Sequence, residues 1–160
     1  AVIPLTQKTI EEVRRIVKDL RPAILDDLGI LATIKWFCRE FQTVCTGIRI
    51  ETKIEIEESD IPLYLKTTIY RIMQEALNNV AKHSKADVVY LQLQKTKTGI
   101  HLTVHDNGHG FDLNRAMDIQ TSLRGFGLAS MRERAEMSGA RFEIASEVQS
   151  GTTIRVVWTD

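Results

Sequence analysis

Residues 69–83, IYRIMQEALNNVAKH, decide how this chain folds. Wound as an α-helix, at about 100° per residue, they form one broad apolar arc that also includes Leu65 upstream. The arc contains Leu65, Ile69, Met73, Ala76, Leu77 and Val80, and a polar stripe of Glu75, Asn79, Lys82 and His83 follows one of its borders. A helix packed on a sheet through this arc would hold the stripe at the rim of the packed layer, half in contact with water. The stripe is therefore a candidate site for a charged ligand, and a simple solvated face is the alternative.

The segments around this helix alternate between helical and strand patterns. Apolar spacing predicts helices over 5–20, 28–45 and 127–138, and strands over 48–56, 86–94, 100–106, 140–147 and 152–158. Pro22 is expected to end the first helix, and Asp60 with Pro62 to begin the central one. This order favours an α+β fold, a two-layer α/β sandwich with helices on one face of a mixed, mostly antiparallel sheet. It does not suit a Rossmann fold, because the βαβ alternation and the GxGxxG turn are missing.

Composition limits the classes of partner. The 160 residues, a length typical of one domain, carry 21 Lys and Arg and 21 Asp and Glu, so net charge does not favour nucleic acid. No long apolar run and no signal-peptide pattern occurs. Cys38 and Cys45 are seven residues apart on a predicted helix, too far for a disulfide, so we expect small buried side chains in a reducing compartment. The chain begins at Ala1 without Met, as a fragment, a processed product or a purification cut would.

A carboxylate ends the strand predicted at 100–106. Side chains alternate along a strand, so Asp106 shares one face with Leu102 and Val104 and points into the apolar layer. An unpaired buried carboxylate is costly, and we therefore expect Asp106 to have a hydrogen-bonding partner. The residues 107–110 that follow would let a flat ligand lie close to the backbone, and an ordinary turn is the alternative.

The polar stripe and a second glycine motif have the chemistry to bind a phosphorylated ligand. Asn79 could offer its amide oxygen to Mg²⁺, and Lys82 and His83 could contact phosphates. Glu75, one turn earlier, could polarise or deprotonate an incoming nucleophile. Residues 125–128, GFGL, open a predicted helix whose N–H groups could bind phosphate, although glycine at a loop–helix junction also occurs for steric reasons.

These motifs occur in the order found in one known family. ExxxNxxKH (Glu75, Asn79, Lys82, His83), DxGxGF (Asp106, Gly108, Gly110, Phe111) and GFGL (Gly125, Gly127, Leu128) closely resemble the ATP-binding domain of sensor histidine kinases. That domain belongs to the superfamily of gyrase B, Hsp90 and MutL. The stretches QEALNNVAKHSKA, GLASMRERA and VRRIVKDLRP look most like its nitrate-sensor and DesK-like branch. The resemblance implies a Bergerat-type fold, with residues 1–21 as the end of a second dimerisation helix and 22–160 as the catalytic and ATP-binding domain.

The resemblance also implies a role for each matching residue. Asp106 would accept a hydrogen bond from the adenine amino group, Asn79 would bind Mg²⁺, and Glu75 would orient or activate a phosphate-accepting histidine. Glycines would let the nucleotide approach or offer it backbone N–H groups, residues 111–124 would form a lid, and one of two threonines would hold adenine through water. The residues implied to contact the nucleotide are Asn79, Lys82, His83, Asp106, Gly108, Gly110, Gly125, Gly127, Leu128 and Thr152 or Thr153.

The phosphate-accepting histidine itself has no match in this chain. The family carries it on an earlier helix, whereas His83, His101, His105 and His109 all fall in the ATP-binding region. His101 and His105 belong to the strand face opposite Asp106. The resemblance implies as partners ATP with Mg²⁺, a histidine-bearing dimerisation domain of a full-length homodimer, and the receiver domain of a response regulator. It also implies that this domain lies in the cytoplasm. The alternatives are a non-catalytic nucleotide-binding module and another enzyme of the superfamily, an anti-sigma-factor-type serine kinase or an ATPase.

Overall fold

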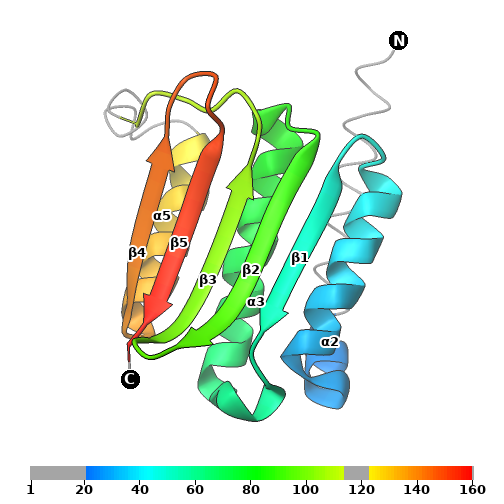
Figure 1. Ribbon diagram of the computed structural model, residues 1–160, viewed down its shortest axis with the longest axis vertical. Coiled ribbons are helices and arrows are strands. Elements are labelled where there is room, and N and C mark those ends of the chain that lie inside the picture. The colour runs from blue at the N-terminus through cyan, green and yellow to red at the C-terminus, as the bar shows by residue number, and fades with distance from the viewer. Residues whose placement is uncertain (1–20, 114–122, 160) are drawn as a thin grey trace.

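The computed structural model describes residues 21–113 and 123–159, so the predicted helix 5–20 and most of the predicted lid lie outside the described residues. The predicted architecture is confirmed. Five strands form one sheet in the order β1-β2-β3-β5-β4, two helices (Leu63–Asn79 and Leu123–Met137) cover one of its faces, and a third (Arg21–Val44) lies beside β1 at the edge of the sheet (Figure 1). β1 runs parallel to β2, and the other neighbouring strands are antiparallel. The sheet is therefore mixed and mostly antiparallel.

The predicted strands are all present, with ends that differ by no more than two residues. They are β1 (Arg49–Glu55), β2 (Val88–Thr96), β3 (Gly99–Asp106), β4 (Ala140–Ser146) and β5 (Thr152–Trp158). The helical elements are α2 (Arg21–Val44), the 3₁₀ turn η1 (Glu58–Asp60), α3 (Leu63–Asn79), its π-helical continuation η2 (Val80–Ser84) and α5 (Leu123–Met137). α3 forms the crossover between the parallel strands β1 and β2, which a hairpin cannot connect.

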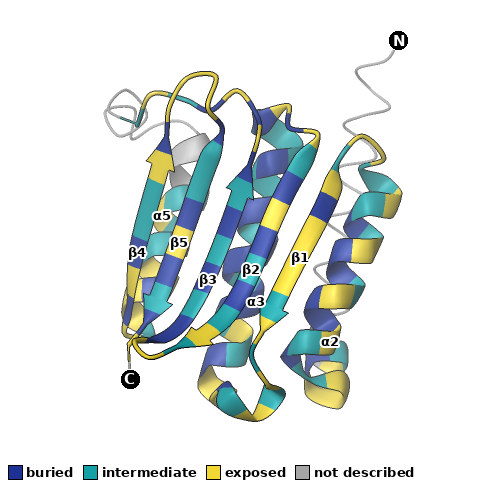
Figure 2. Cartoon of the chain, in the orientation of Figure 1, coloured by how far each residue is buried: buried dark blue, intermediate teal, exposed yellow. Residues whose placement is uncertain are grey.

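The apolar arc of α3 is buried as predicted. Leu65, Ile69, Met73, Ala76, Leu77 and Val80 are each at most 4% exposed. The inward residues of the strands complete the core, and they appear as dark bands that alternate with lighter ones along the strands in Figure 2. Because burial contributes roughly 25 cal/mol per Å² of apolar surface, this contact fixes α3 and its polar border to the sheet.

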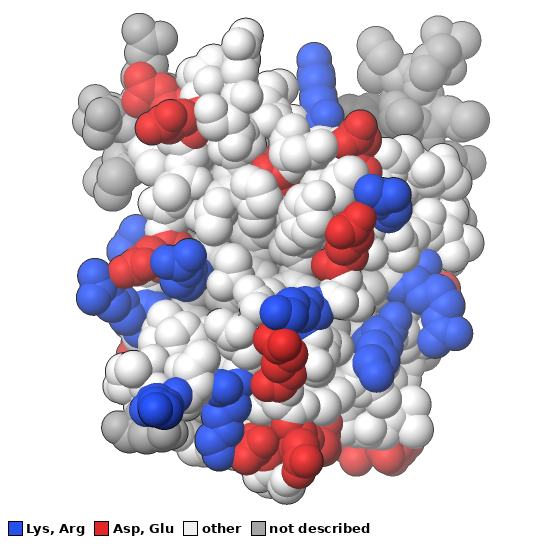
Figure 3. Space-filling view, in the orientation of Figure 1, with Lys and Arg blue, Asp and Glu red and all other residues white. Residues whose placement is uncertain are grey.

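The other face of the sheet is polar and carries charges of both signs (Figure 3). Ion pairs on this face join residues two apart on one strand, at 2.9 Å for Arg49 and Glu51 and 3.2 Å for Lys53 and Glu55. Exposed pairs of this kind contribute at most about 1 kcal/mol. Among residues 21–113 and 123–159, no helix is long and apolar enough to cross a membrane. Cys38 is a buried free thiol, as expected, whereas Cys45 is a free thiol that is only half-buried.

The start of the second helix differs from its prediction. α2 begins at Arg21 rather than near residue 28, with Pro22 in its first turn, and a kink at Gly29 (φ 79°) divides it. After the kink, the carboxylate of Glu58 accepts hydrogen bonds from the N–H groups of Ile30 at 2.9 Å and Leu31 at 3.0 Å. A side chain 28 residues away thus restarts the helix, and local periodicity contains no sign of that contact.

The expected cap of the central helix is also wrong. Asp60 ends η1 and pairs with Lys95 at 2.7 Å, while Pro62 occupies the N-cap position of α3 without a side-chain hydrogen bond. Asp60 does not cap α3 because its carboxylate instead accepts the Glu57 N–H at 3.2 Å, in the capping box of η1, and pairs with Lys95. The chain then enters α3 through the fixed backbone of proline.

Candidate active site

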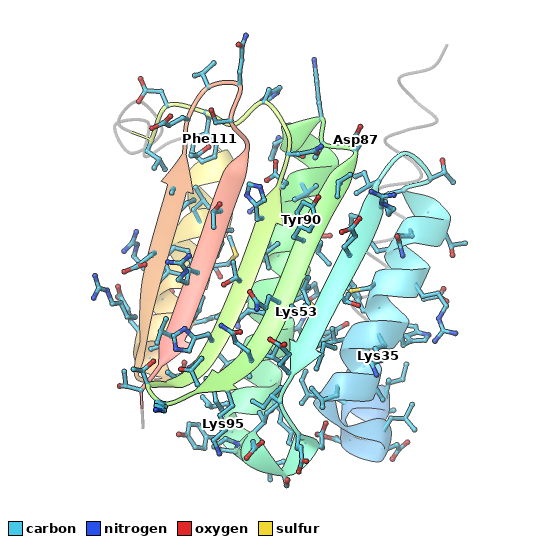
Figure 4. The ribbon with its side chains drawn as sticks, viewed as in Figure 1. Lys35, Lys53, Asp87, Tyr90, Lys95 and Phe111 are labelled. Carbon is cyan, nitrogen blue, oxygen red and sulfur yellow. The ribbon has the colours of Figure 1, made fainter. Side chains whose placement is uncertain are left out.

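One end of the sandwich gathers segments that are far apart in the sequence. The end of β3, the start of β5, the end of α3 with η2, and the start of α5 meet at the upper end in Figure 1. Phe111 and Asp87, labelled in Figure 4, mark the same end. Every residue singled out from the sequence as a site residue belongs to one of these segments or directly follows it.

Asp106 is buried at this end, as predicted. Its side chain is on the inward face of β3, the residue is 4% exposed, and Oδ1 accepts a hydrogen bond from the Gly108 N–H at 2.9 Å. Burial raises the pKa of the Asp106 carboxyl, and the N–H groups of Gly108 and Thr152 together with His105 and His109 oppose that rise. One bond from Gly108 leaves acceptor capacity on the carboxyl group. The group can therefore bind a ligand that offers N–H donors.

The glycines of the DxGxG segment face protein backbone rather than open space. A Cβ on Gly108 would lie 2.2 Å from the carbonyl oxygen of Ser84, and one on Gly110 (φ 57°) would lie 2.0 Å from that of Glu147. His109 completes the contact, because its N–H donates to Ser84 at 2.9 Å. The segment is clamped between η2 and the β4–β5 turn, so glycine has a steric reason at both positions apart from any approach by a ligand.

Glu75 and Asn79 both face α5, at the position of Gly127. A Cβ on Gly127 would lie 2.5 Å from Oε1 of Glu75 and 3.3 Å from Oδ1 of Asn79. Both side chains are half-buried, one helical turn apart on α3. A carboxylate and an amide oxygen close together beside α5 can act as a general base and as a ligand of a hard cation, respectively.

Lys82 and His83 lie on the π-helical turn η2, and the prediction of one regular helix through residue 83 is wrong there. Regular helix ends at Asn79, and the wider turn that follows changes the direction of the stripe. Ser84 closes the turn: its hydroxyl donates to the carbonyl of Val80 and accepts the N–H of Ala86, both at 3.0 Å. Lys82 and His83 remain half-buried at the same end as Asp106, and π turns of this kind recur at functional sites.

α5 begins earlier than predicted. Its first residue is Leu123, so Gly125 lies in the first turn and Gly127 and Leu128 in the second. The unbonded N–H groups of a helix are those of its first four residues, which here include Gly125 and exclude Gly127. Each glycine costs a helix about 1 kcal/mol relative to alanine, and the glycine pair hid the true start of α5 in the sequence. Gly127 instead provides the space in which Glu75 and Asn79 approach the helix.

Thr152 and Thr153 point to opposite faces of the sheet. Thr152 is the direct cross-strand partner of Asp106 and shares its inward face. Thr153 is on the open face, where its Oγ1 lies 2.9 Å from Nδ1 of His105, and that ring stacks on Tyr90 (Figure 4) with centroids 5.9 Å apart. A groove of about 660 Å³ beside β4 is lined by Thr153 and by no other predicted site residue.

Ser146 belongs to this end of the molecule and was missed by the sequence interpretation. Ser146 is 9% exposed. Its Oγ accepts a hydrogen bond from the Phe111 N–H at 2.9 Å and donates one to the Gly151 carbonyl at 3.1 Å. The same Oγ lies 2.9 Å from Oγ1 of Thr152. The sequence did contain a signal. In the strand predicted at 140–147 the inward positions are Ala140, Phe142 and Ile144, and the next one holds this polar residue beside a turn.

The donor set fits Mg²⁺ only in company with a ligand. In the part of the chain that the structure describes, no three His, Cys, Asp or Glu side chains group so that they could hold a metal ion. Mg²⁺ commonly keeps several waters and binds through one or two protein oxygens and the phosphates of a substrate. The Asn79 amide oxygen suits that mode of binding.

A family described as "Histidine kinase-, DNA gyrase B-, and HSP90-like ATPase" matches residues 65–160. This chain belongs to that family. Histidine kinases are among its curated relatives: DegS of Brevibacillus brevis, a signal transduction histidine-protein kinase/phosphatase, is 35% identical over 94% of this chain. The oxygen sensor histidine kinase NreB of Staphylococcus carnosus is 33% identical over 98% of it. The chain spans 37% and 44% of the lengths of these two relatives.

Solved histidine kinase structures share the fold of this ATPase-family chain. The histidine kinase domain of the Erythrobacter litoralis EL346 blue-light activated kinase superposes with a TM-score of 0.69 at 15% identity, over 96% of this chain and 75% of that one. The mycobacterial sensor histidine kinase MprB gives a TM-score of 0.60 at 17% identity, over 81% of this chain and 95% of that one. The predicted resemblance to histidine kinases is thereby confirmed at the level of family and fold.

Proposed function

We propose that this chain is the catalytic and ATP-binding part of a sensor histidine kinase. It binds Mg-ATP and transfers the γ-phosphoryl group to a histidine on a dimerisation helix of the full-length homodimer, from which a response regulator takes it. Residues 22–160 are the catalytic unit and residues 1–21 the end of a dimerisation helix, and the unit works in the cytoplasm. The named activities of DegS and NreB support this proposal.

In this proposal Asp106 selects the adenine base. Its carboxyl group is buried at a strand end, is already held by one backbone N–H, and retains acceptor capacity for the amino group of adenine. Thr152 is its neighbour across the β3–β5 ladder and supports the same ring. Thr153 is left out of the adenine site because it lies on the opposite face of the sheet.

The border between α3 and α5 would hold the phosphates and the metal. Asn79 would bind Mg²⁺, and the ion would neutralise charge that develops on the phosphates. The N–H groups in the first turn of α5, including that of Gly125, would bind phosphate oxygens. Lys82, His83 and Leu128 would complete the phosphate site. Glu75 orients the acceptor histidine or takes its proton. Catalysis of phosphoryl transfer depends mostly on such positioning and charge stabilisation.

The observation that carries the proposal is the burial of the Asp106 carboxyl at the end of β3, where the Gly108 N–H bonds to Oδ1. Asp106→Asn keeps the shape and the bond from Gly108 but presents an amide donor to the adenine amino group. The loss of the hydrogen bond from the adenine amino group should cost about 2 kcal/mol and weaken Mg-ATP binding roughly 30-fold. Titration calorimetry on the folded variant measures this change. Asp87→Asn is the matched control, because Asp87 is an exposed carboxylate at the same end of the sheet and should bind Mg-ATP normally. Undiminished binding by Asp106→Asn would remove the site assignment.

A second experiment identifies the reaction. The chain is incubated with labelled ATP and a separately supplied pair of dimerisation helices that carry the acceptor histidine. Acid-labile phosphohistidine on the helices is expected. Acid-stable phosphoserine on another protein would point to the serine kinase alternative, and binding without any transfer would point to a regulatory module.

A further inference from the structure

The hydroxyl of Ser146 has three polar neighbours but only one hydrogen to donate. Phe111 contributes an N–H at 2.9 Å, which can only donate, and Gly151 contributes a carbonyl oxygen at 3.1 Å, which can only accept. The third neighbour is Oγ1 of Thr152 at 2.9 Å, which can do either. A hydroxyl offers one O–H donor and two acceptor lone pairs.

One arrangement of hydrogens makes all three contacts hydrogen bonds. Ser146 must give its hydrogen to the Gly151 carbonyl, since that oxygen has no other way to bond with it. Ser146 then accepts from the Phe111 N–H and from the hydroxyl of Thr152. The hydrogen of Thr152 is consumed in this bond, and only lone pairs of its oxygen remain for a ligand.

This places two acceptors side by side at the end of the sheet. Thr152 lies directly across the ladder from Asp106, so their side chains share one face and are near neighbours. Thr152 is half-buried rather than buried, so a ligand can approach this residue at the end of the sheet. A purine with an amino group at the 6-position can donate to this pair, directly or through a water molecule. A 6-oxo purine would present a third acceptor and be rejected.

We propose that Ser146 is a positioning residue that sets base specificity, by fixing the Thr152 hydroxyl as an acceptor for a 6-amino purine. The inference rests on the proposed function, because it assigns the adenine end of the same nucleotide site. Ser146 does not touch the base and acts through Thr152. Without it, the Thr152 hydroxyl is free to turn and donate to a 6-oxo group.

The test is the ratio of the dissociation constants for ITP and ATP. ITP has a 6-oxo acceptor in place of the 6-amino donor and carries a hydrogen on N1, and these two differences are the same for every variant compared. The chain is titrated with each nucleotide and Mg²⁺. Ser146→Ala is expected to lower the ITP/ATP ratio by about tenfold, the equivalent of one hydrogen bond of about 1.4 kcal/mol. The matched control is Ser150→Ala, which removes a hydroxyl from an exposed residue of the same turn and should leave the ratio unchanged.

A double-mutant cycle shows whether the effect passes through Thr152. Thr152→Val alone should lower the ratio, Thr152→Ser should preserve it, and adding Ser146→Ala to Thr152→Val should change it no further. Equal weakening of ATP and ITP binding by Ser146→Ala, or additive effects in the double variant, would mean a purely structural role and overturn the proposal. If Ser146→Ala does not fold, two other variants test the proposal: Ser146→Thr should keep the wild-type ITP/ATP ratio, and Thr152→Val should lower it. A different result for either variant would overturn the proposal. Absence of ATP binding by the wild-type chain would instead refute the proposed function.

Discussion

Glu58→Gln tests the long-range contact that restarts α2 after its kink. The carboxylate accepts the N–H groups of Ile30 and Leu31 at 2.9 and 3.0 Å and pairs with Lys66 on α3. Gly29 lies so close that a Cβ there would be 2.6 Å from the Glu58 carboxylate. One side chain therefore holds α2, η1 and α3 together, and replacing it with its neutral isostere changes little except charge and acceptor number.

The expected cost of Glu58→Gln is about 2 kcal/mol of unfolding free energy. Hydrogen bonds to a charged group contribute about 1.5–3 kcal/mol each, and an amide can accept only one of the two N–H groups well. Because the Glu58 side chain is 38% exposed, solvent screens both the lost bond and the ion pair with Lys66, and the sum stays near the lower bound. In urea, with a slope of about 1–3 kcal/mol per molar, the midpoint should fall by roughly 1 M.

The matched control is Glu55→Gln, since Glu55 is exposed and pairs across 3.2 Å with the exposed Lys53. Its effect should stay below about 0.5 kcal/mol. Equal effects of the two variants would refute the reasoning that Glu58 braces the helix start.

The Glu58 effect should also depend on pH. Partial burial acts to raise the pKa of the Glu58 carboxyl, but the bonds from Leu31, Lys66 and Ile30 outweigh it and lower the pKa below its usual 4.5. A lowered pKa means that the stabilisation is fully present above 4.5 and is lost as the pH falls through the folded-state value. The gap between wild type and Glu58→Gln should therefore close in acid.

Three further outcomes are expected. Gly127→Ala should gain up to about 1 kcal/mol of stability from helix propensity. It should also slow phosphoryl transfer to supplied dimerisation helices about tenfold to a hundredfold, because the new Cβ displaces the Glu75 carboxylate. An unchanged transfer rate would contradict this prediction. The Asp106→Asn variant should become more stable relative to wild type as the pH rises above 3.8, because burial raises the pKa of the Asp106 carboxyl and penalises its ionised form. Denaturation curves in acid and at neutral pH measure this. The same difference in unfolding free energy between the two proteins at both pH values would contradict it. Cys38 is 4% exposed, and burial raises the pKa of its thiol to about 12. In the native state it should therefore resist a maleimide, while the half-buried Cys45 reacts first. Equal labelling of the two cysteines, measured by mass spectrometry, would contradict this prediction.

Periodicity was sufficient wherever a residue's environment depends on its own element. The arc of α3 and the inward face of β3 follow directly from 3.6- and 2-residue periods, which is why the burial of Leu77 and Asp106 was predictable. The same rule separates Thr152 from Thr153, although a choice between them required the register with β3. The strand ends followed from glycine and turn residues beside them.

The features that escaped prediction depend on partners distant in the sequence or on hydrogen-bond geometry. Glu58 reaches the backbone of Ile30 across 28 residues, and no local pattern encodes that contact. The π turn at Val80–Ser84 is stabilised by the hydrogen bonds of Ser84 to Val80 and Ala86. A search for regular helical periodicity cannot detect such a turn. Ser146 was visible as a polar residue in an inward position, but its three partners come from three separate segments.

The parallel pairing of β1 with β2 has a practical consequence for anyone who trims this protein. A piece that starts at residue 65, where the family match begins, would retain every proposed ligand-binding residue. It would still lack α2, β1 and the first two residues of α3. The seven-residue ladder from Arg49↔Val88 to Glu55↔Gln94 would be lost. β2 would then be an exposed edge strand, and its unpaired N–H and C=O groups could pair with the strands of other chains. Expression boundaries for this domain therefore belong upstream of α2.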